Sequence, residues 1–163
     1  MNPRFIERPA GAPAQAPAAR WLTSERGIVL ASVVLYLVSL GLPAIAELYP
    51  GGGRIDTAGY LVLGMGMIGL LAGQIGWFAN PLWLLGAILL WRRRWTGAAT
   101  AAAGALLVGS ASFFLQRTGM PSDSGDNIPT RLLIGFYVWW ASLWVLAIGA
   151  VVRWFQTSRF AEG

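Results

Sequence analysis

The sequence predicts an all-α integral membrane protein with four transmembrane helices and a glycine-rich interfacial or re-entrant segment before the second helix. Composition is the first of three observations: 56% of the 163 residues are hydrophobic and only 12% are charged, whereas soluble domains carry about 25% charged residues. The second observation is a series of long apolar stretches, and the third is an uneven distribution of arginine. The length fits one domain.

The apolar stretches define the predicted spans. They lie at residues 27–46, 58–91, 96–115 and 132–152. About 20 helical residues, at about 1.5 Å each, cross a hydrocarbon layer of about 30 Å, so the first, third and fourth stretches each predict one span. Residues 1–24 are rich in proline and alanine and predict a disordered cytoplasmic tail. A four-helix transmembrane domain is expected over residues 25–155, followed by a short cytoplasmic tail over residues 156–163.

The first stretch has a competing interpretation as a secretory signal peptide. Arg20 and Arg26 precede it, and an Ala-Ile-Ala tripeptide at residues 44–46 resembles an A-x-A cleavage site. The basic region is long and the apolar run is near full spanning length, so we favour a retained span.

The second stretch is too long for one straight crossing, because residues 58–91 would form a helix of about 51 Å. Placing the span at residues 70–91 leaves nine arginines on one side of the membrane, at positions 4, 8, 20, 26, 92, 93, 94, 153 and 159. The other side then holds Arg54, Arg117 and Arg131. Five spans would divide the arginines six against six. The positive-inside rule therefore predicts four spans with both termini in the cytoplasm.

The segment before this second span, residues 58–69, carries four glycines and no charge. Apolar, glycine-rich backbone of this kind is typical of an interfacial helix or a re-entrant hairpin, which survives at membrane depth only when it packs in protein or lines a cavity. A short helix of a tight two-span hairpin remains the alternative.

Polar residues interrupt the second span at Gln74 and Asn80, beside Pro81. Proline removes a backbone donor and clashes with the preceding turn, so a kink here frees carbonyl groups near Trp77. We favour the interpretation that Asn80 and Gln74 bond these carbonyls or a neighbouring helix. The alternative is a polar contact for a ligand or a lipid headgroup at the same four residues.

Helix packing is predicted by small residues that recur every four positions in the third span, Gly97, Ala101, Ala105 and Gly109. This stripe suits a contact within the bundle or against another subunit. The fourth span carries large aromatic side chains that we expect to face lipid or a partner, Tyr137, Trp139, Trp140 and Trp144.

A basic triplet, Arg92, Arg93 and Arg94, lies between Trp91 and Trp95. This pattern is typical of an anchor at the cytoplasmic interface, in contact with lipid headgroups. The net charge of +5 comes from arginines that flank apolar stretches, so it predicts orientation in a bilayer and not a nucleic-acid partner.

Several function classes are excluded by residue types that the sequence lacks. It contains no cysteine and no histidine, which removes disulfides, thiolate metal sites, histidine haem ligands and histidine bases. The predicted spans hold no ionisable residue well away from their ends, whereas proton-coupled transporters usually keep one. We therefore expect no catalytic residue, no cofactor, no metal site and no enzyme activity.

Three segments, "LPAIAE", "GYLVLGMGMIGLLAGQIGWFANPLWLLGAILLWRRR" and "GFYVWWAS", together resemble a group of small bacterial inner-membrane proteins of uncharacterised function. Their shared feature is a W-[FY]-A-N-P motif before an aliphatic span, and the resemblance covers most of residues 42–142. It implies a bacterial inner-membrane location and supplies no activity. Twelve basic residues without a single lysine also favour a GC-rich bacterial genome. Aquaporins carry two Asn-Pro-Ala motifs, whereas Asn80 and Pro81 occur once here and precede Leu82.

The sequence thus predicts an accessory or structural membrane protein that acts through helix and lipid contacts. Its expected partners are the lipid bilayer and either further copies of the chain or the subunits of a larger membrane complex. The alternative is an oligomeric small channel or transporter that uses the Gln74 and Asn80 region.

Overall fold

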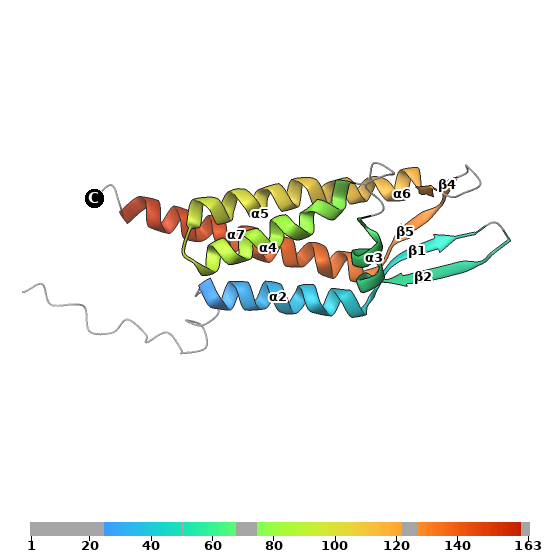
Figure 1. Ribbon diagram of the computed structural model, residues 1–163, viewed down its shortest axis with the longest axis horizontal. Helices are drawn as coiled ribbons and strands as arrows, with labels where there is room; N and C mark the ends of the chain where they lie inside the picture. The colour runs from blue at the N-terminus through green and yellow to red at the C-terminus, as the bar shows by residue number, and fades with distance from the viewer. Residues whose placement is uncertain (1–24, 50, 68–74, 122–126, 161–163) are drawn as a thin grey trace, which may run out of the picture.

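Four long helices run side by side along the long axis of the molecule, with a small sheet at one end (Figure 1). The structure is a computed structural model that describes residues 25–49, 51–67, 75–121 and 127–160. The helices are α2 (Glu25–Gly41), α4 (Ala79–Trp91), α5 (Trp95–Ser110) and α7 (Ile134–Phe160). Successive helices run in opposite directions, so α2 and α5 lead to the sheet while α4 and α7 lead away from it.

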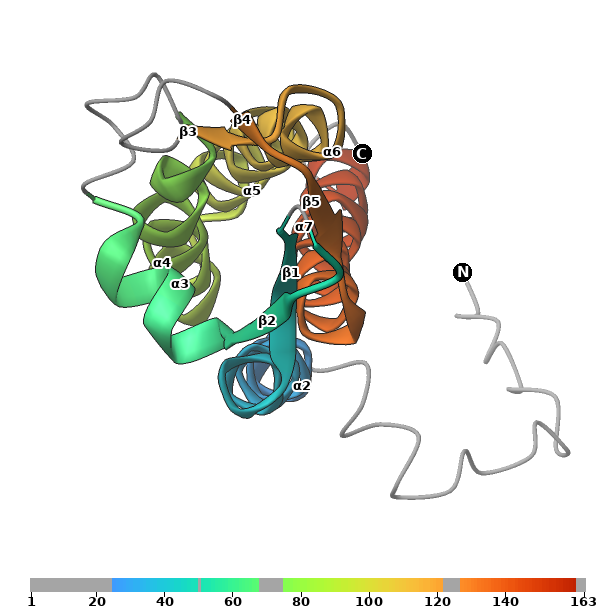
Figure 2. The same ribbon diagram turned by 90° about the vertical axis from the view of Figure 1, so that its right-hand side faces the viewer.

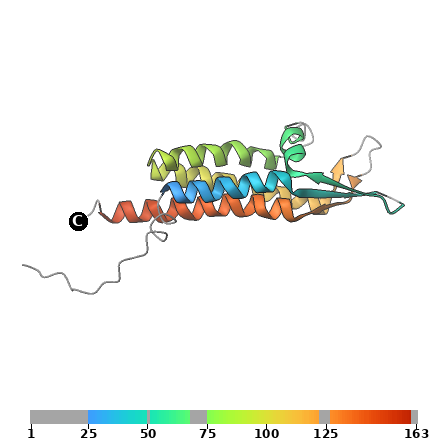
Figure 3. The same cartoon turned by 90° about the horizontal axis from the view of Figure 1, so that it is seen from below.

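The sheet has three antiparallel strands in the order β2-β1-β5, formed by β1 (Pro43–Leu48), β2 (Arg54–Ala58) and β5 (Thr130–Leu132). Ala46 of the central strand pairs with Asp56 on one side and Arg131 on the other. The β1–β2 hairpin projects beyond the helices (Figure 3). A second pair, β3 (Met120–Pro121) and β4 (Asn127–Ile128), lies nearby. The chain is mostly helical, as predicted, but the prediction that it is all-α is wrong because these strands are present.

The first apolar stretch divides between a helix and a strand. Its last residues, Ala44 to Ala46, are buried in β1. Strands on both sides of β1 pair with the backbone of Ile45 and Ala46. Gly51 and Gly52 turn the chain back into β2 with φ of +97° and +88°, a backbone that glycine adopts without strain.

Two helical stretches of the described chain are long and apolar enough to cross a membrane, Trp95–Thr118 and Ile134–Ser158. The first comprises α5, the 3₁₀ turn η3 (Ala111–Phe114) and α6 (Leu115–Thr118). The sequence predicted four such membrane-spanning helices. The helix α2 has 17 residues because its apolar stretch continues into β1, and Ile75–Trp91 is a shorter apolar helix. Residues 1–24 and Gln74, on which further predictions rest, lie outside the described residues.

The glycine-rich segment forms in part a short helix, α3 (Gly59–Met65). It follows β2 directly and lies at the sheet end, between the ends of α2 and α4 (Figure 2). A side chain at Gly59 would collide with the backbone oxygen of Ser39, so glycine permits α3 to begin against the end of α2. At the other end of the chain, α7 continues to Phe160, into the predicted C-terminal tail.

Small residues let the helices pack closely. Gly86 of α4 faces the backbone of Ala98 and Ala102 in α5, where an added Cβ would lie 3.4 Å from the Ala102 nitrogen. In the predicted stripe, Ala101, Ala105 and Gly109 are buried and Gly97 is half-buried. The buried face of α5 also includes Ala98 and Ala102, because α5 packs on both α4 and α7.

The aromatic residues of α7 do not all face outward. Tyr137 and Trp144 are exposed, as expected. Trp139 and Trp140 instead pack against the buried core, and Trp140 meets the ring of Phe113 edge to face at 5.2 Å. The expectation that all four rings face lipid or a partner is therefore wrong for these two.

The predicted basic anchor forms the turn between α4 and α5, at the end of the bundle opposite the sheet. All three arginines are exposed. Arg93 has a left-handed backbone with φ of +58°, which costs a non-glycine residue about 1–2 kcal/mol.

Arg93→Gly is accordingly expected to raise the free energy of unfolding by about 0.5–1 kcal/mol, because glycine adopts this conformation without a steric penalty. Thermal unfolding in detergent measures the change. Arg92→Gly is the matched control, since Arg92 has φ of −83° and gains nothing from glycine. Equal effects of the two changes would show that strain at Arg93 is not the cause.

Candidate functional site

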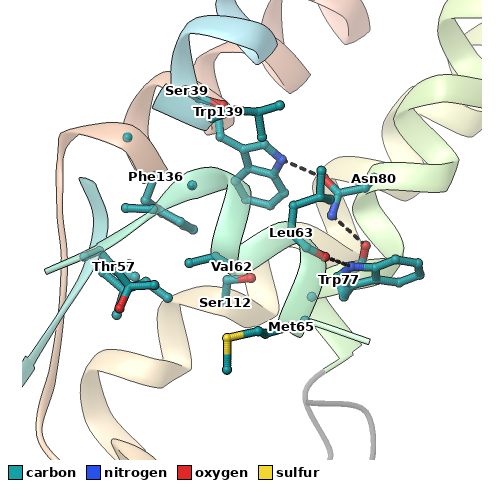
Figure 4. A pocket seen from close by; sticks show the side chains of 18 of the residues that line it. Ser39, Thr57, Val62, Leu63, Met65, Trp77, Asn80, Ser112, Phe136 and Trp139 are labelled. Carbon is teal, nitrogen blue, oxygen red and sulfur yellow. Dashed lines mark hydrogen bonds between the residues drawn. The ribbon is translucent and has the colours of Figure 1, made fainter. Parts of the chain in front are cut away.

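Asn80, the second residue of α4, joins three helices through its side-chain amide (Figure 4). Its Oδ1 accepts hydrogen bonds from Tyr36 Oη of α2 and Trp139 Nε1 of α7, each at 3.0 Å. Its Nδ2 donates to the backbone oxygen of Trp77 at 2.9 Å. One side chain therefore bridges α2, α4 and α7 at the sheet end of the bundle.

Pro81 explains why Asn80 bonds backwards to Trp77. In a continuous helix the N–H of residue 81 would donate to the carbonyl of residue 77, and proline has no N–H to give. The Asn80 amide supplies the donor instead. Pro81 does not kink a long helix, because a 3₁₀ turn, η2 (Ile75–Phe78), precedes α4 and Pro81 lies in the first turn of α4, where proline is tolerated.

A second polar link lies one turn deeper in the bundle. Trp83 Nε1 donates to Ser32 Oγ at 2.8 Å, and Ser32 Oγ donates to the backbone oxygen of Ser142 at 2.8 Å. The rings of Tyr36 and Trp83 stack between the two links with centroids 4.2 Å apart. Both links join α2, α4 and α7.

Sequence reasoning missed the contribution of α2 to this site. The available signal was the spacing of Ser32, Tyr36 and Ser39, which recur at i, i+4 and i+7 in a helix that is otherwise apolar after Arg26. That spacing puts all three on one helical face, and the structure buries all three.

A cavity of about 400 Å³ lies between Asn80 and the sheet, a size within the usual range for small-molecule sites. We call it the Asn80 cavity. Its walls come from nearly every element at this end of the bundle, α2, α3, η2, α4, η3, α6, β1, β2, β5 and α7. Apolar and aromatic side chains such as Val62, Leu63, Phe136 and Trp139 form most of the lining (Figure 4).

Trp77 holds α3 over this cavity. Its Nε1 donates to the backbone oxygen of Leu63 at 2.9 Å, and its ring lies against Gly66, where any side chain would collide with it. Trp77 therefore ties η2 to α3. The glycine at position 66 makes that close approach possible.

The charged groups near the cavity are few. Among the described residues that line it, Glu47 has the only carboxylate and none is an arginine. Tyr49 Oη donates to Glu47 Oε2 at 2.7 Å, and this hydrogen bond to a carboxylate raises the pKa of Tyr49.

A separate ion pair lies on β2, outside the cavity lining. Hydrogen bonds from Arg54 lower the pKa of Asp56 there. The described residues contain no group of three acidic side chains placed to hold a metal ion.

The predicted site residues fall into three separate places. Trp77, Asn80 and Pro81 lie together at the entry to α4. The small-residue stripe lies along α5, and the basic triplet lies at the opposite end of the bundle. Gln74 is outside the described residues, so its predicted bond to the freed carbonyls or to a neighbouring helix stays a prediction.

The chain matches no family model, and the comparisons with curated proteins and with solved structures found no match. The resemblance through the W-[FY]-A-N-P motif therefore stays a prediction.

Proposed function

We propose that this chain is a four-span protein of the bacterial inner membrane that has no catalytic role and acts as an accessory or structural component through helix and lipid contacts. Both termini lie in the cytoplasm, and the sheet lies on the other side of the bilayer. The spans are α2, η2 with α4, α5 with η3 and α6, and α7.

The observation that carries this proposal is the outward face of the bundle, where all four helices expose large apolar side chains. Helices on the surface of a soluble protein carry charged or polar residues on their outer face. Here large apolar side chains are exposed on every helix, including Leu30, Val34, Leu37, Leu84, Leu85, Ile88, Leu107, Trp144, Ile148 and Val152. Leu107, in the middle of a candidate span, is 76% exposed. A hydrocarbon environment removes the cost of exposing such side chains to water.

The position of the arginines supports the proposed orientation. Arg26 at the start of α2, the triplet at residues 92–94 and Arg153 near the end of α7 lie toward one end of the bundle. The end with the sheet carries Arg54, Arg117 and Arg131. The richer end faces the cytoplasm by the positive-inside rule. At 17 residues, α2 is at the short limit of about 17–25 residues for a membrane span.

Labelling of single cysteines tests the orientation, since the chain has no native cysteine. In spheroplasts, an impermeant maleimide is expected to label Ile55→Cys on the exposed part of β2 without permeabilisation. It should label Arg93→Cys only after the membrane is opened, with Ser158→Cys as a second cytoplasmic position. Labelling of position 93 in intact spheroplasts would contradict the four-span orientation.

The accessory role predicts that no acidic side chain is needed for chemistry. The double variant Glu47→Gln and Asp56→Asn is expected to correct any growth defect of a deletion strain as well as the unchanged chain does. Loss of complementation by a double variant that reaches normal membrane levels would favour a chemical role at the sheet end.

An oligomeric channel or transporter is the second candidate, and the Asn80 cavity favours it. Below Asn80, buried Trp83, Ala87 and Leu90 of α4 pack in the core of the bundle, so a path for solutes would run between subunits. Solute flux into vesicles that contain the purified protein, compared with empty vesicles, distinguishes this candidate from the accessory role.

A further inference from the structure

We propose that the Asn80 cavity binds an uncharged membrane amphiphile, whose apolar body lies along the aromatic walls and whose carbonyl oxygen accepts hydrogen bonds from the cavity. This inference rests on the proposed function for the presence of a bilayer. It adds a specific ligand site to the general lipid contacts.

The first argument is that the cavity contains unused hydrogen-bond donors in an apolar setting. In the described part of the chain, the hydroxyls of Thr57 and Ser112 line the cavity and have no hydrogen-bond partner. Asn80 Nδ2 donates one of its two N–H groups to the backbone oxygen of Trp77, and its second N–H is a further donor. The described residues contain no fully buried side-chain polar atom that lacks a partner, so these two hydroxyls stay accessible from the cavity. A carbonyl oxygen in the cavity would supply an acceptor for them.

The second argument is the charge of the lining. An anionic headgroup or a fatty-acid carboxylate needs a cationic partner when it leaves water, and no arginine is among the described residues that line the cavity. The single acidic side chain, Glu47, already accepts a hydrogen bond from exposed Tyr49. These groups favour a ligand without charge.

The third argument is the shape and chemistry of the walls. Phe136 and Trp139 from α7, Trp77 from η2 and Val62 from α3 bound the space from separate directions (Figure 4). Mostly apolar walls with a few convergent polar groups are characteristic of sites for apolar small molecules. Two kinds of membrane molecule offer an uncharged carbonyl on an apolar body: diacyl esters such as diacylglycerol, and isoprenoid quinones.

Photo-crosslinking of the full-length chain in dodecyl maltoside micelles tests the proposal, because this detergent has no carbonyl group. The probe is a diacylglycerol with a diazirine on one acyl chain, and peptide mass spectrometry locates the crosslinks. We expect crosslinks to cavity residues such as Val62 and Phe136. Val62→Trp, which fills the space, should abolish the cavity crosslinks.

Removal of the free hydroxyls should weaken binding. The pair Thr57→Val and Ser112→Ala is expected to raise the probe concentration needed for half-maximal crosslinking by about fivefold or more, which corresponds to at least one lost hydrogen bond. The matched control is the pair Thr100→Val and Ser110→Ala, whose hydroxyls bond within their own helix and lie outside the cavity. The control should bind the probe unchanged.

Competition then separates the two sources of ligand. Displacement of the cavity crosslinks by dioleoylglycerol supports a diacyl ester, and displacement by decylubiquinone supports a quinone. Crosslinks that persist in Val62→Trp, or equal binding by the hydroxyl pair and its control, would overturn the proposal. The proposal would also be overturned if the lipophilic cation tetraphenylphosphonium displaced the cavity crosslinks more strongly than the two uncharged competitors do, and if the Glu47→Gln change removed that displacement.

The crosslinks on the outer surface report separately on the proposed function. If only the cavity proposal fails, the probe should still label exposed positions such as Leu107 and Ile148 through the micelle. If the bundle is not embedded in apolar surroundings, these outer crosslinks should be missing as well.

Discussion

Asn80→Leu is expected to lower the free energy of unfolding by about 2–4 kcal/mol, the largest effect of any single change considered. The substitution removes three hydrogen bonds, from Tyr36, from Trp139 and to the Trp77 carbonyl. Interhelical hydrogen bonds in membrane proteins contribute about 0.6–1.7 kcal/mol each. Thermal unfolding of the purified chain in detergent measures the loss.

A double mutant shows how much of this loss comes from the carbonyl that Pro81 leaves free. Alanine at position 81 restores an N–H that can donate to Trp77, so Pro81→Ala gives Asn80 less to satisfy. The double change Asn80→Leu and Pro81→Ala should then cost less than the sum of the single changes, since residues that share one network are not additive. Additive losses would contradict this account of Pro81.

The same variant separates a structural role of Asn80 from a role in ligand binding. If Asn80 served only a ligand, Asn80→Leu would fail to complement a deletion strain while its unfolding temperature stayed constant. We expect instead that both the unfolding temperature and complementation fall, because Asn80 bridges three helices that enclose the cavity.

Ala105→Leu is expected to have the second-largest effect, a loss of about 1–3 kcal/mol from overpacking. Ala105 is 1% exposed and belongs to the core cluster, on the helix that packs against both α4 and α7. Ala103 of the same helix is exposed, so Ala103→Leu is the matched control and should change stability little. Equal unfolding temperatures for the two variants would mean that the α5 stripe is not a close contact.

Local chemistry made several features of this protein predictable from the sequence. Gly97, Ala101, Ala105 and Gly109 recur with the period of a helix, and three of the four are buried. The missing N–H of Pro81 frees a carbonyl four residues earlier, and the Asn80 amide lies close enough along the chain to bond it. Helix periodicity and proline chemistry both involve residues within one or two turns, so neighbours along the chain are enough to indicate them.

The sheet could not be predicted in the same way. Residues 43–46 read as the end of an apolar helix, and they form a strand because partners arrive from residues 54–58 and 130–132. Strand preference depends on such neighbours more than on the strand itself. The one local signal was the glycine run at residues 51–53 between two short segments, which is typical of a hairpin turn.

The sequence by itself indicated the apolar helices, the end of the bundle that carries more arginine, and the amide that bonds the carbonyl freed by Pro81, since each depends on neighbours along the chain. Only the tertiary structure decided that Trp139 turns inward, because its N–H finds an oxygen on another helix. It also decided that α3 and the sheet enclose a cavity beside Asn80. Contacts between segments far apart in the chain leave no periodic pattern in any one of them, so they emerge only when the helices and strands assemble.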